Sequence, residues 1–279
     1  MVEIAFSEEL NKEIEAKEAN KLSRKGSLKS KYTFHCLDPD CAIPLTCTNW
    51  GKVGKRYYFA PSSNSVLHID GCNQISSTEL KSQNKNDFTT SKNIVNNGGL
   101  IIIDRYSNRP KTQVATNRQP VKSKNNTNHQ NNGNNTKGTK TQNSHRSSMY
   151  SLIQLWRDNA IPNNVGFLRI DGQRITLNDL FVNVGNLNQI ADQLPHIFYG
   201  EATVSYSRKK PVGFYFPAFT DAKLYSNYDQ LIKRAATSRI KEYINSGNMT
   251  TVFFRGYYDQ NLKKFKSFND KFYQDIYIE

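Results

Sequence analysis

Cys36-Leu37-Asp38-Pro39-Asp40-Cys41 and His68-Ile69-Asp70-Gly71-Cys72 are the two stretches that decide how the N-terminal part of this chain folds. The first places four residues between two cysteines, and the second places three between a histidine and a cysteine. Closed zinc sites take four Cys or His ligands from two short segments of this kind. We therefore predict one structural Zn²⁺ ion, bound by Cys36, Cys41, His68 and Cys72. Such a site stabilises the fold and performs no chemistry.

Two alternatives for the cysteines remain open. Cys47, the remaining cysteine of the chain, could replace Cys41 as a ligand. A reactive cysteine is the second alternative, because His35 adjoins Cys36 and His68 lies four positions before Cys72. Adjacent residues of a strand point to opposite faces, so the His35 and Cys36 side chains would diverge. We expect no disulfides, since residues 1–10 are too acidic and too poor in apolar residues for a signal peptide. The protein is therefore expected to be cytoplasmic.

No stretch of the sequence predicts a membrane span. The most apolar run, residues 98–103, is far below the roughly 18 residues that a transmembrane helix needs. We expect the protein to have no membrane partner.

The order of aromatic, cysteine and histidine residues between about 30 and 75 resembles a known module. Phe34, Cys36 and Cys41 are followed by Tyr58-Phe59-Ala60 and then by His68 and Cys72. This order is similar to that of the zinc-finger-like N-terminal module of the competence protein CoiA family. The resemblance implies a zinc-binding module, although the family usually has two residues, not four, between the knuckle cysteines.

The nuclease domain of that family does not obviously follow. A restriction-like nuclease needs an acidic residue on one strand and Glu-x-Lys or Gln-x-Lys on the next, because these groups hold Mg²⁺ and the attacking water. Asp104 is a candidate carboxylate, but no Glu-x-Lys follows it before residue 107, and Glu79-Leu80-Lys81 precedes it. A polar strand terminus is the simpler interpretation of Asp104. A divergent metal-dependent nuclease remains the third hypothesis for the function.

The middle of the chain has the composition of a linker. From Ser107 to Met149 there is no Phe, Tyr or Trp, and Asn, Lys, Thr, Ser and Gln fill most positions. Lys and Arg outnumber Asp and Glu by 12 to 3 in residues 73–150, against 10 to 9 before this segment and 16 to 12 after it. Such a segment buries too little apolar surface to become ordered. It would act as a polar spacer, as a basic arm along a phosphate backbone, or as both.

The predicted fold class is α+β, with a small zinc-knuckle module, a disordered basic linker and a β-rich C-terminal domain. Residues 1–29 read as a charged N-terminal arm, although an exposed helix over 6–23 fits as well. The zinc-binding module covers 30–106, the Asn- and Lys-rich linker 107–148, and the C-terminal domain 149–279. Because the linker separates the two domains, we expect Cys36→Ser to unfold the N-terminal module alone.

The C-terminal domain alternates short helices and aromatic strands. Leu152, Leu155 and Trp156 predict a helix that begins at Met149, and Asp171-Gly172 predicts a tight hairpin. Helical spacing also appears in 186–194 and 228–244. Four segments rich in aromatic and β-branched residues predict strands: 197–206, 213–216, 250–258 and 273–278. Strands interrupted by one helix fit an oligonucleotide-binding (OB) barrel, and they fit a generic α+β sheet equally well.

Basic residues interleaved with aromatic ones favour nucleic acid as the partner. Aromatic faces stack on bases and cations track phosphates in single-strand binding. The candidate nucleic-acid contacts are Arg208, Lys209, Lys210, Tyr215, Arg255, Tyr257, Lys263 and Lys264. Each has a simpler interpretation, because strand tyrosines are often half-buried and 208–210 is a typical solvated turn.

We therefore predict a non-enzymatic, zinc-containing protein that binds single-stranded DNA or RNA. Its Asn-, Lys-, Ile- and Tyr-rich composition is typical of AT-rich coding DNA, which suggests a bacterial mobile element or phage. A protein-interaction adaptor in phage defence or counter-defence is the alternative, because many zinc knuckles bind protein. The sequence leaves the nucleic-acid type, the sequence preference and the oligomeric state open.

Overall fold

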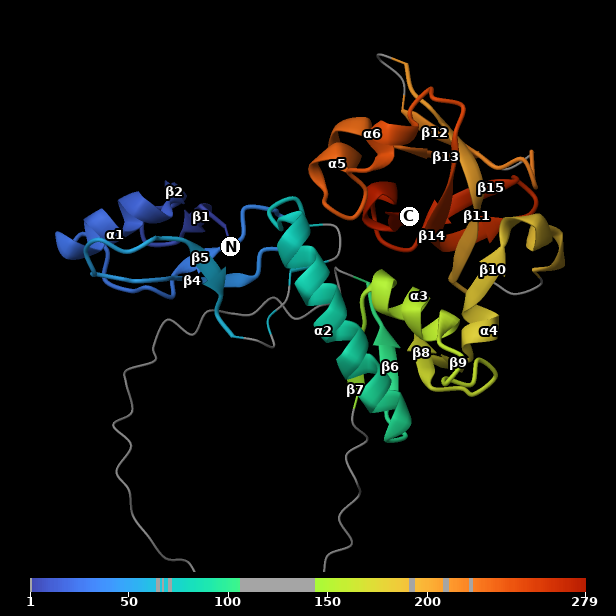
Figure 1. The fold of residues 1–279 in the computed structure, drawn as a ribbon, viewed down its shortest axis with the longest axis horizontal. Helices are drawn as coiled ribbons and strands as arrows, with labels where there is room; N and C mark the ends of the chain where they lie inside the picture. Colours follow the sequence, from blue (N-terminus) through green and yellow to red (C-terminus); the bar gives the residue numbers. More distant parts are fainter. Residues whose placement is uncertain are drawn as a thin grey trace, which may run out of the picture.

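The computed structural model describes residues 2–63, 66, 68–69, 72–105, 144–190, 194–207, 211–220 and 223–279. They form three β-sheets together with short and long helices, so the chain is a mixed helix and sheet protein. In Figure 1 the N-terminal sheet and the C-terminal sheet lie on opposite sides of helix α2. The predicted linker, 107–148, lies outside the described residues as far as 143.

The first sheet has the strand order β2-β1-β3-β4-β5, with every neighbouring pair antiparallel. Its strands are β1 Ile4–Ser7, β2 Lys12–Glu15, β3 Phe34–His35, β4 Pro44–Cys47 and β5 Phe59–Pro61. Val2 and Phe59 exchange two backbone hydrogen bonds of 3.0 and 2.7 Å, which close the sheet on itself. Helix α1, Ala16–Arg24, follows β2 directly.

The charged arm that we predict for residues 1–29 is instead part of this sheet. Ala5 lies opposite Ile14 in the β1–β2 pair, and both side chains are buried. They join a core that includes Phe34, Leu45 and Phe59, each fully buried. The charged residues of the segment occupy the outward positions of a half-buried hairpin and helix, so their i,i+4 spacing did not indicate a free arm.

The second sheet joins residues from both sides of the predicted linker. Its order is β7-β6-β8-β9, and β6 is parallel to both β7 and β8. Its strands and two helices are α2 Ser77–Asn96, β6 Leu100–Ile103, β7 Ser144–Arg146, α3 Met149–Arg157, β8 Leu168–Ile170 and β9 Gln173–Ile175. The domain boundary expected at 106 therefore separates β6 from its partners, and β7 lies inside the stretch predicted as linker.

Two local predictions for this region are confirmed. Helix α3 begins at Met149, where the Ser148 side chain accepts a hydrogen bond from Ser151 N. Asp171 and Gly172 connect β8 to β9 with φ of 46° and 83°, the two positive values that a tight two-residue hairpin requires. Leu152 and Leu155 are fully buried in a core shared with β6 and β8.

The third sheet follows the order β13-β12-β11-β14-β15, with β10 added beside β11 and β16 beside β14. Its strands are β10 Phe181–Asn183, β11 His196–Ser205, β12 Val212–Tyr215, β13 Lys223–Ser226, β14 Met249–Asp259, β15 Lys264–Ser267 and β16 Ile276–Ile278. Its short helices are α4 Leu177–Leu180, η2 Val184–Gln189, α5 Tyr228–Lys233, α6 Ile240–Tyr243 and η3 Phe272–Gln274.

This third sheet is curled into a half-barrel. The terminal strands β13 and β15 approach each other within 8 Å between Cα atoms, although they form no ladder among the described residues. Phe198, Phe214 and Phe254 fill the concave side, and each is at most 1% exposed. Figure 1 shows α5 and α6 beside β12 and β13 at one end of this sheet.

Two predicted helices differ from the structure. The helix over 228–244 is broken into α5 and α6, because Arg234 takes the extended values φ −101° and ψ 126° and is buried away from the helix axis. The helix over 186–194 is a 3₁₀-helix that begins and ends earlier, at Val184–Gln189.

Among the described residues, no helix combines the length and the apolar character needed to cross a membrane.

Candidate metal centre

The first pair of sulphur ligands is held by a tight turn after β3. Cys36 N donates to Ile43 O at 3.0 Å, and the N–H groups of Cys41 and Ala42 both donate to Asp38 O, at 3.0 and 2.8 Å. Ala42 has a φ of 40°, a left-handed value that lets the chain reverse into β4. The four residues between the cysteines therefore form one compact turn that points both Sγ atoms to the same side.

The second pair comes from the chain that precedes α2. Cys72 N donates to Ile69 O at 2.9 Å, and Gln74 N lies 3.4 Å from Cys72 Sγ. Gln83, on α2, donates its side-chain N–H to His68 O at 2.7 Å. The long helix thus fixes the histidine end of the site.

The four predicted ligands converge. Sγ of Cys36, Cys41 and Cys72 and a ring nitrogen of His68 all lie within 4.8 Å of one another. The Cys36–Cys72 Sγ separation is 3.5 Å, and Nδ1 of His68 lies 3.4 Å from Cys41 Sγ and 3.2 Å from Cys72 Sγ. A tetrahedral ion with metal–sulphur and metal–nitrogen bonds of zinc's length requires separations of about 3.8 and about 3.6 Å. The donor set therefore fits a four-coordinate metal ion after small adjustments.

The electrostatics of the cluster also favour a cation. Hydrogen bonding with Cys36 holds the pKa of Cys41 well below its usual range. Hydrogen bonds with Cys41 and with Cys36 raise the pKa values of Cys36 and Cys72, respectively. Buried sulphurs this close support one thiolate among three, whereas a divalent ion stabilises all three as thiolates.

Cys47 is not part of the cluster. It lies on β4, opposite Phe59, with Sγ 3.9 Å from Ala16 O. It is 1% exposed, and burial raises its pKa to about 11. The alternative in which Cys47 replaces Cys41 is therefore wrong in this structure, and Cys47 packs as a core thiol.

Among the described residues, neither the pairing of His35 with Cys36 for a reactive cysteine nor the nuclease alternative gains support, whereas the imidazole beside the thiols is the predicted ligand His68. His35 Nε2 lies 2.6 Å from Glu8 Oε1, and its Nδ1 faces Ala42 O at 3.3 Å, so the ring is engaged away from the thiols. Asp104 accepts a hydrogen bond from Arg146 Nε at 2.7 Å. A strand-end ion pair accounts for this carboxylate.

The turn between Cys36 and Cys41 is also attached to the C-terminal domain. Asp38 Oδ2 accepts from Asn73 N at 2.8 Å and lies 3.6 Å from Nη2 of Arg234. Asp40 lies within 4 Å of both Arg234 and Lys271. The turn thus connects both ligand pairs to residues that follow β13, a contact between the predicted domains that sequence spacing could not indicate.

The predicted nucleic-acid contacts that the structure describes lie in different environments. Arg208, Lys209 and Lys210 lie outside the described residues. Arg255 is 2% exposed, and its Nε donates to Asp275 at 3.1 Å, which corrects its assignment as a phosphate contact. Tyr257 is hydrogen-bonded to Asp171 and Arg105 on the side of the second sheet.

Three of the predicted nucleic-acid contacts are exposed or half-buried, and one of them, Tyr215, has two further accessible residues beside it. Lys263 and Lys264 are exposed at the β14–β15 turn, and half-buried Tyr215 is at the end of β12. Lys223 and Tyr225, which the sequence analysis did not select, lie beside Tyr215 on β13. The sequence feature that could have identified them is the alternation Lys223-Leu224-Tyr225-Ser226, which is typical of a half-buried strand. Leu224 and Ser226 are buried, and the other two are exposed.

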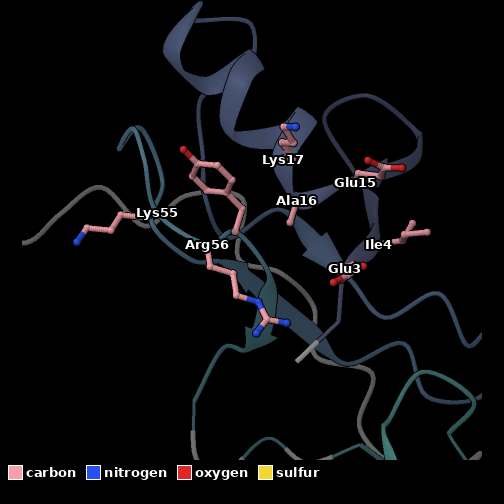
Figure 2. Close-up of a pocket in the computed structure, with 8 residues that line it drawn as sticks. Glu3, Ile4, Glu15, Ala16, Lys17, Lys55 and Arg56 are labelled. Carbon is pink, nitrogen blue, oxygen red and sulfur yellow. The ribbon is translucent and has the colours of Figure 1, made fainter.

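A separate groove of about 450 Å³ lies beside β1 and β2, on the N-terminal sheet. Figure 2 shows Glu3, Ile4 and Glu15 together on one side of it, and Lys55 extending away. Lys17 and Arg56 also line it, so charges of both signs are mixed. This mixture selects no class of ligand.

No family model, no curated protein and no solved structure matches this chain.

Proposed function

We propose that this chain is a non-enzymatic binding protein that holds single-stranded nucleic acid on the outer face of β12 and β13, and that its Cys/His cluster binds a structural Zn²⁺. Zinc is the ion of choice for this cluster because three thiolates and one imidazole form one of its usual closed shells. A closed shell leaves no position for a substrate, so the ion's role is to stabilise the N-terminal module.

The observation that carries the proposal is the strand order of the third sheet. An OB barrel has five curled strands in the cyclic order first-second-third-fifth-fourth, with a helix between the third and the fourth. The order β13-β12-β11-β14-β15, with α5 and α6 between β13 and β14, corresponds to that arrangement. The approach of β13 to β15 supports a partly open barrel of the same kind.

The face that OB barrels use for oligonucleotides carries the required chemistry here. They bind across their second and third strands, between the first-second and fourth-fifth loops. On β12 and β13 the rings of Tyr215 and Tyr225 lie 6.5 Å apart at 88°, and Lys223 Nζ lies 5.9 Å from the Tyr215 ring centroid. Tyr225 is 43% exposed. A half-buried and an exposed ring beside a cation suit base stacking and phosphate contact.

The absence of a side chain at Gly213 leaves room for the ring of Tyr215. A Cβ placed on Gly213 would lie 2.8 Å from the Tyr215 ring, so the ring covers the backbone at this position. The loop from β11 to β12 contains Arg208, Lys209 and Lys210, and the loop from β14 to β15 contains Lys263. Both loops that border the face are therefore basic.

The test is binding of labelled oligo-dT and oligo-rU to the full chain over a salt series. Lys223→Ala/Tyr225→Ala should weaken binding about tenfold or more, because one stacked base contributes about 1–3 kcal/mol. Lys31→Ala/Tyr32→Ala is the matched control, since Tyr32 is 54% exposed and Lys31 lies 4.9 Å over its ring. Equal losses in both variants, or no salt-dependent binding at all, would contradict the proposal and favour a protein partner.

A further inference from the structure

A cleft of about 800 Å³ lies between α2, the segment that joins α5 to α6, and β16. It is separate from the face of β12 and β13, since no residue of those strands lines it. Its volume is within the range of about 300–1,000 Å³ that is usual for small-molecule sites. Its lining residues come from α2, from Tyr150 on α3, from the segment between α5 and α6 and from the last three residues of the sequence.

Asn84 in the wall of this cleft has an unused polar group. Its side chain is 7% exposed and makes no hydrogen bond with any described residue. The next two polar residues on the same face of α2, Asp87 and Ser91, are both hydrogen-bonded to other side chains. Since neither amide atom is among the fully buried atoms that lack a partner, the amide is open to the cleft and available to a ligand there.

The rim of the cleft is positively charged. Lys81 and Lys85 are exposed one helical turn apart on α2, and neither forms an ion pair with a described residue. Like charges at this spacing repel each other by about 0.2–0.5 kcal/mol, which a bound anion would relieve. Arg239 adds a third cation, held at 3.4 Å by the exposed Glu242.

The side-chain carboxylate of Glu279, which lines the cleft, is already ion-paired. Glu279 accepts hydrogen bonds from both terminal nitrogens of Arg157, at 2.6 and 2.9 Å. Tyr150 and Tyr277 complete the wall, with ring centroids 6.3 Å apart and an interplanar angle of 59°. Cations, an amide and aromatic faces thus line one cavity.

We propose that this cleft binds a phosphorylated nucleoside. Lys81, Lys85 and Arg239 contact the phosphate, the Asn84 amide pairs with the edge of the base, and Tyr150 provides an aromatic surface for it. An amide presents a donor and an acceptor together, which is the pattern that an adenine edge complements. The ligand is either a free nucleotide or the terminal nucleotide of a strand, and this site does not depend on the function proposed above.

The test is calorimetric titration of the full chain with adenosine 5′-monophosphate and, separately, with 5′-phosphorylated hexa-dA. The hexanucleotide is titrated in the Lys223→Ala/Tyr225→Ala chain, so that the face of β12 and β13 does not contribute. Lys81→Ala/Lys85→Ala should weaken binding at least tenfold. Lys17→Ala/Lys21→Ala, an exposed lysine pair at the same spacing on α1, is the control and should have no effect.

Asn84→Leu tests the amide, because it keeps the side-chain size. It should reduce the preference for adenosine monophosphate over ribose 5-phosphate, leaving only the part that contact with Tyr150 provides. A cleft-dependent signal with the mononucleotide identifies a free nucleotide as the ligand, and one with the hexanucleotide alone identifies a strand end. Binding of neither probe, or equal binding by the Lys81/Lys85 variant and its control, overturns the proposal.

Discussion

Arg234 Nη2 lies 3.6 Å from Oδ2 of Asp38, and both side chains are 1% exposed. The guanidinium also lies 4.5 Å from the ring centroid of Tyr273. Its Nε and Nη1 atoms are buried without a hydrogen-bond partner among the described residues. The turn that carries Cys36 and Cys41 is therefore attached to the C-terminal domain by a buried cation whose interactions are incomplete.

Removing this cation should destabilise the chain. Arg234→Met leaves Asp38 buried without its counter-charge, and breaking a buried pair in this way costs about 3–5 kcal/mol. Arg239→Met, at an exposed ion pair with Glu242, should change the free energy of unfolding by no more than about 0.5 kcal/mol. Urea denaturation of both variants measures the difference. A similar small effect of both would show that the buried pair contributes nothing.

The same contact should make the stability of the C-terminal domain depend on that of the N-terminal module. The sequence suggested that loss of the metal would unfold the N-terminal module alone, but Arg234 and Lys271 contact the turn between the ligands. The chain has one tryptophan on each side, Trp50 near Phe34 and Trp156 stacked on Phe181. In a Trp50→Phe chain, a chelator should therefore lower the urea midpoint reported by Trp156.

Arg234→Met provides the control for that coupling. If the contact transmits the loss of metal, the chelator should shift the Trp156 midpoint much less in the Trp50→Phe/Arg234→Met chain. An equal shift in both chains would mean that the coupling follows another route, such as α2. No shift in either would restore the expectation of independent domains.

Metal content distinguishes the four cysteines. We expect about one zinc per purified chain, and Cys36→Ser, Cys41→Ser, Cys72→Ser and His68→Ala should each lower this content strongly because they remove one of four ligands. Cys47→Ser should keep the metal, since Cys47 lies outside the cluster. Elemental analysis of the five variants is the measurement. Loss of zinc from Cys47→Ser with the variant still folded would contradict the ligand set.

The raised pKa of Cys47 gives a second test of the ligand set, in the natural chain. Burial raises that pKa to about 11, so at pH 8 this thiol is protonated and unreactive in the folded chain. After chelation in native buffer, an alkylating reagent should label Cys41, whose pKa is lowered, before Cys47. Peptide mass analysis over time gives the order. Early labelling of Cys47 would show that the N-terminal sheet opens when the metal leaves.

Short-range patterns predicted the parts of this fold that depend on short-range physics. The Asp171-Gly172 hairpin follows from two residues that tolerate positive φ, and the long strands β11 and β14 follow from their aromatic and β-branched residues. The ligand set was predictable because metal-binding residues are few and their spacing is distinctive. The choice between Cys41 and Cys47 was not, because it depends on the tertiary contacts that bring Cys41 to His68 and bury Cys47 against Ala16.

The features that the sequence did not predict depend on contacts between residues far apart in the chain. The 228–244 segment has a helical pattern throughout, but Arg234 leaves the helix to reach Asp38, almost 200 positions earlier in the chain. The run Leu100–Ile103 reads as a strand, yet its partner β7 lies at the end of the predicted linker and its partner β8 lies beyond it. Exposure along β13 identified Tyr225 and Lys223, whereas composition had selected the buried Arg255.

Asp87 on α2 is hydrogen-bonded to residues at the start of α3. It is 4% exposed and accepts hydrogen bonds from Ser151 Oγ at 2.5 Å and from Ser148 N at 2.8 Å, with His145 Nε2 at 2.6 Å. Burial by itself would raise the pKa of Asp87, but these hydrogen bonds outweigh it and the pKa is lowered. Asp87→Asn should therefore cost about 1.5–3 kcal/mol of stability at neutral pH.

The sign of the pH dependence follows from that lowered pKa. A carboxyl whose pKa is lower in the folded chain stabilises it fully above the unfolded value, about 3.9, and loses this contribution as the pH falls through the folded value. The stability difference between the natural chain and Asp87→Asn should shrink as the pH falls below about 4. Release of metal in acid affects both chains equally, so the difference isolates Asp87. The exposed Asp270→Asn is the control, and a difference as large and as pH-dependent there would remove Asp87 from this role.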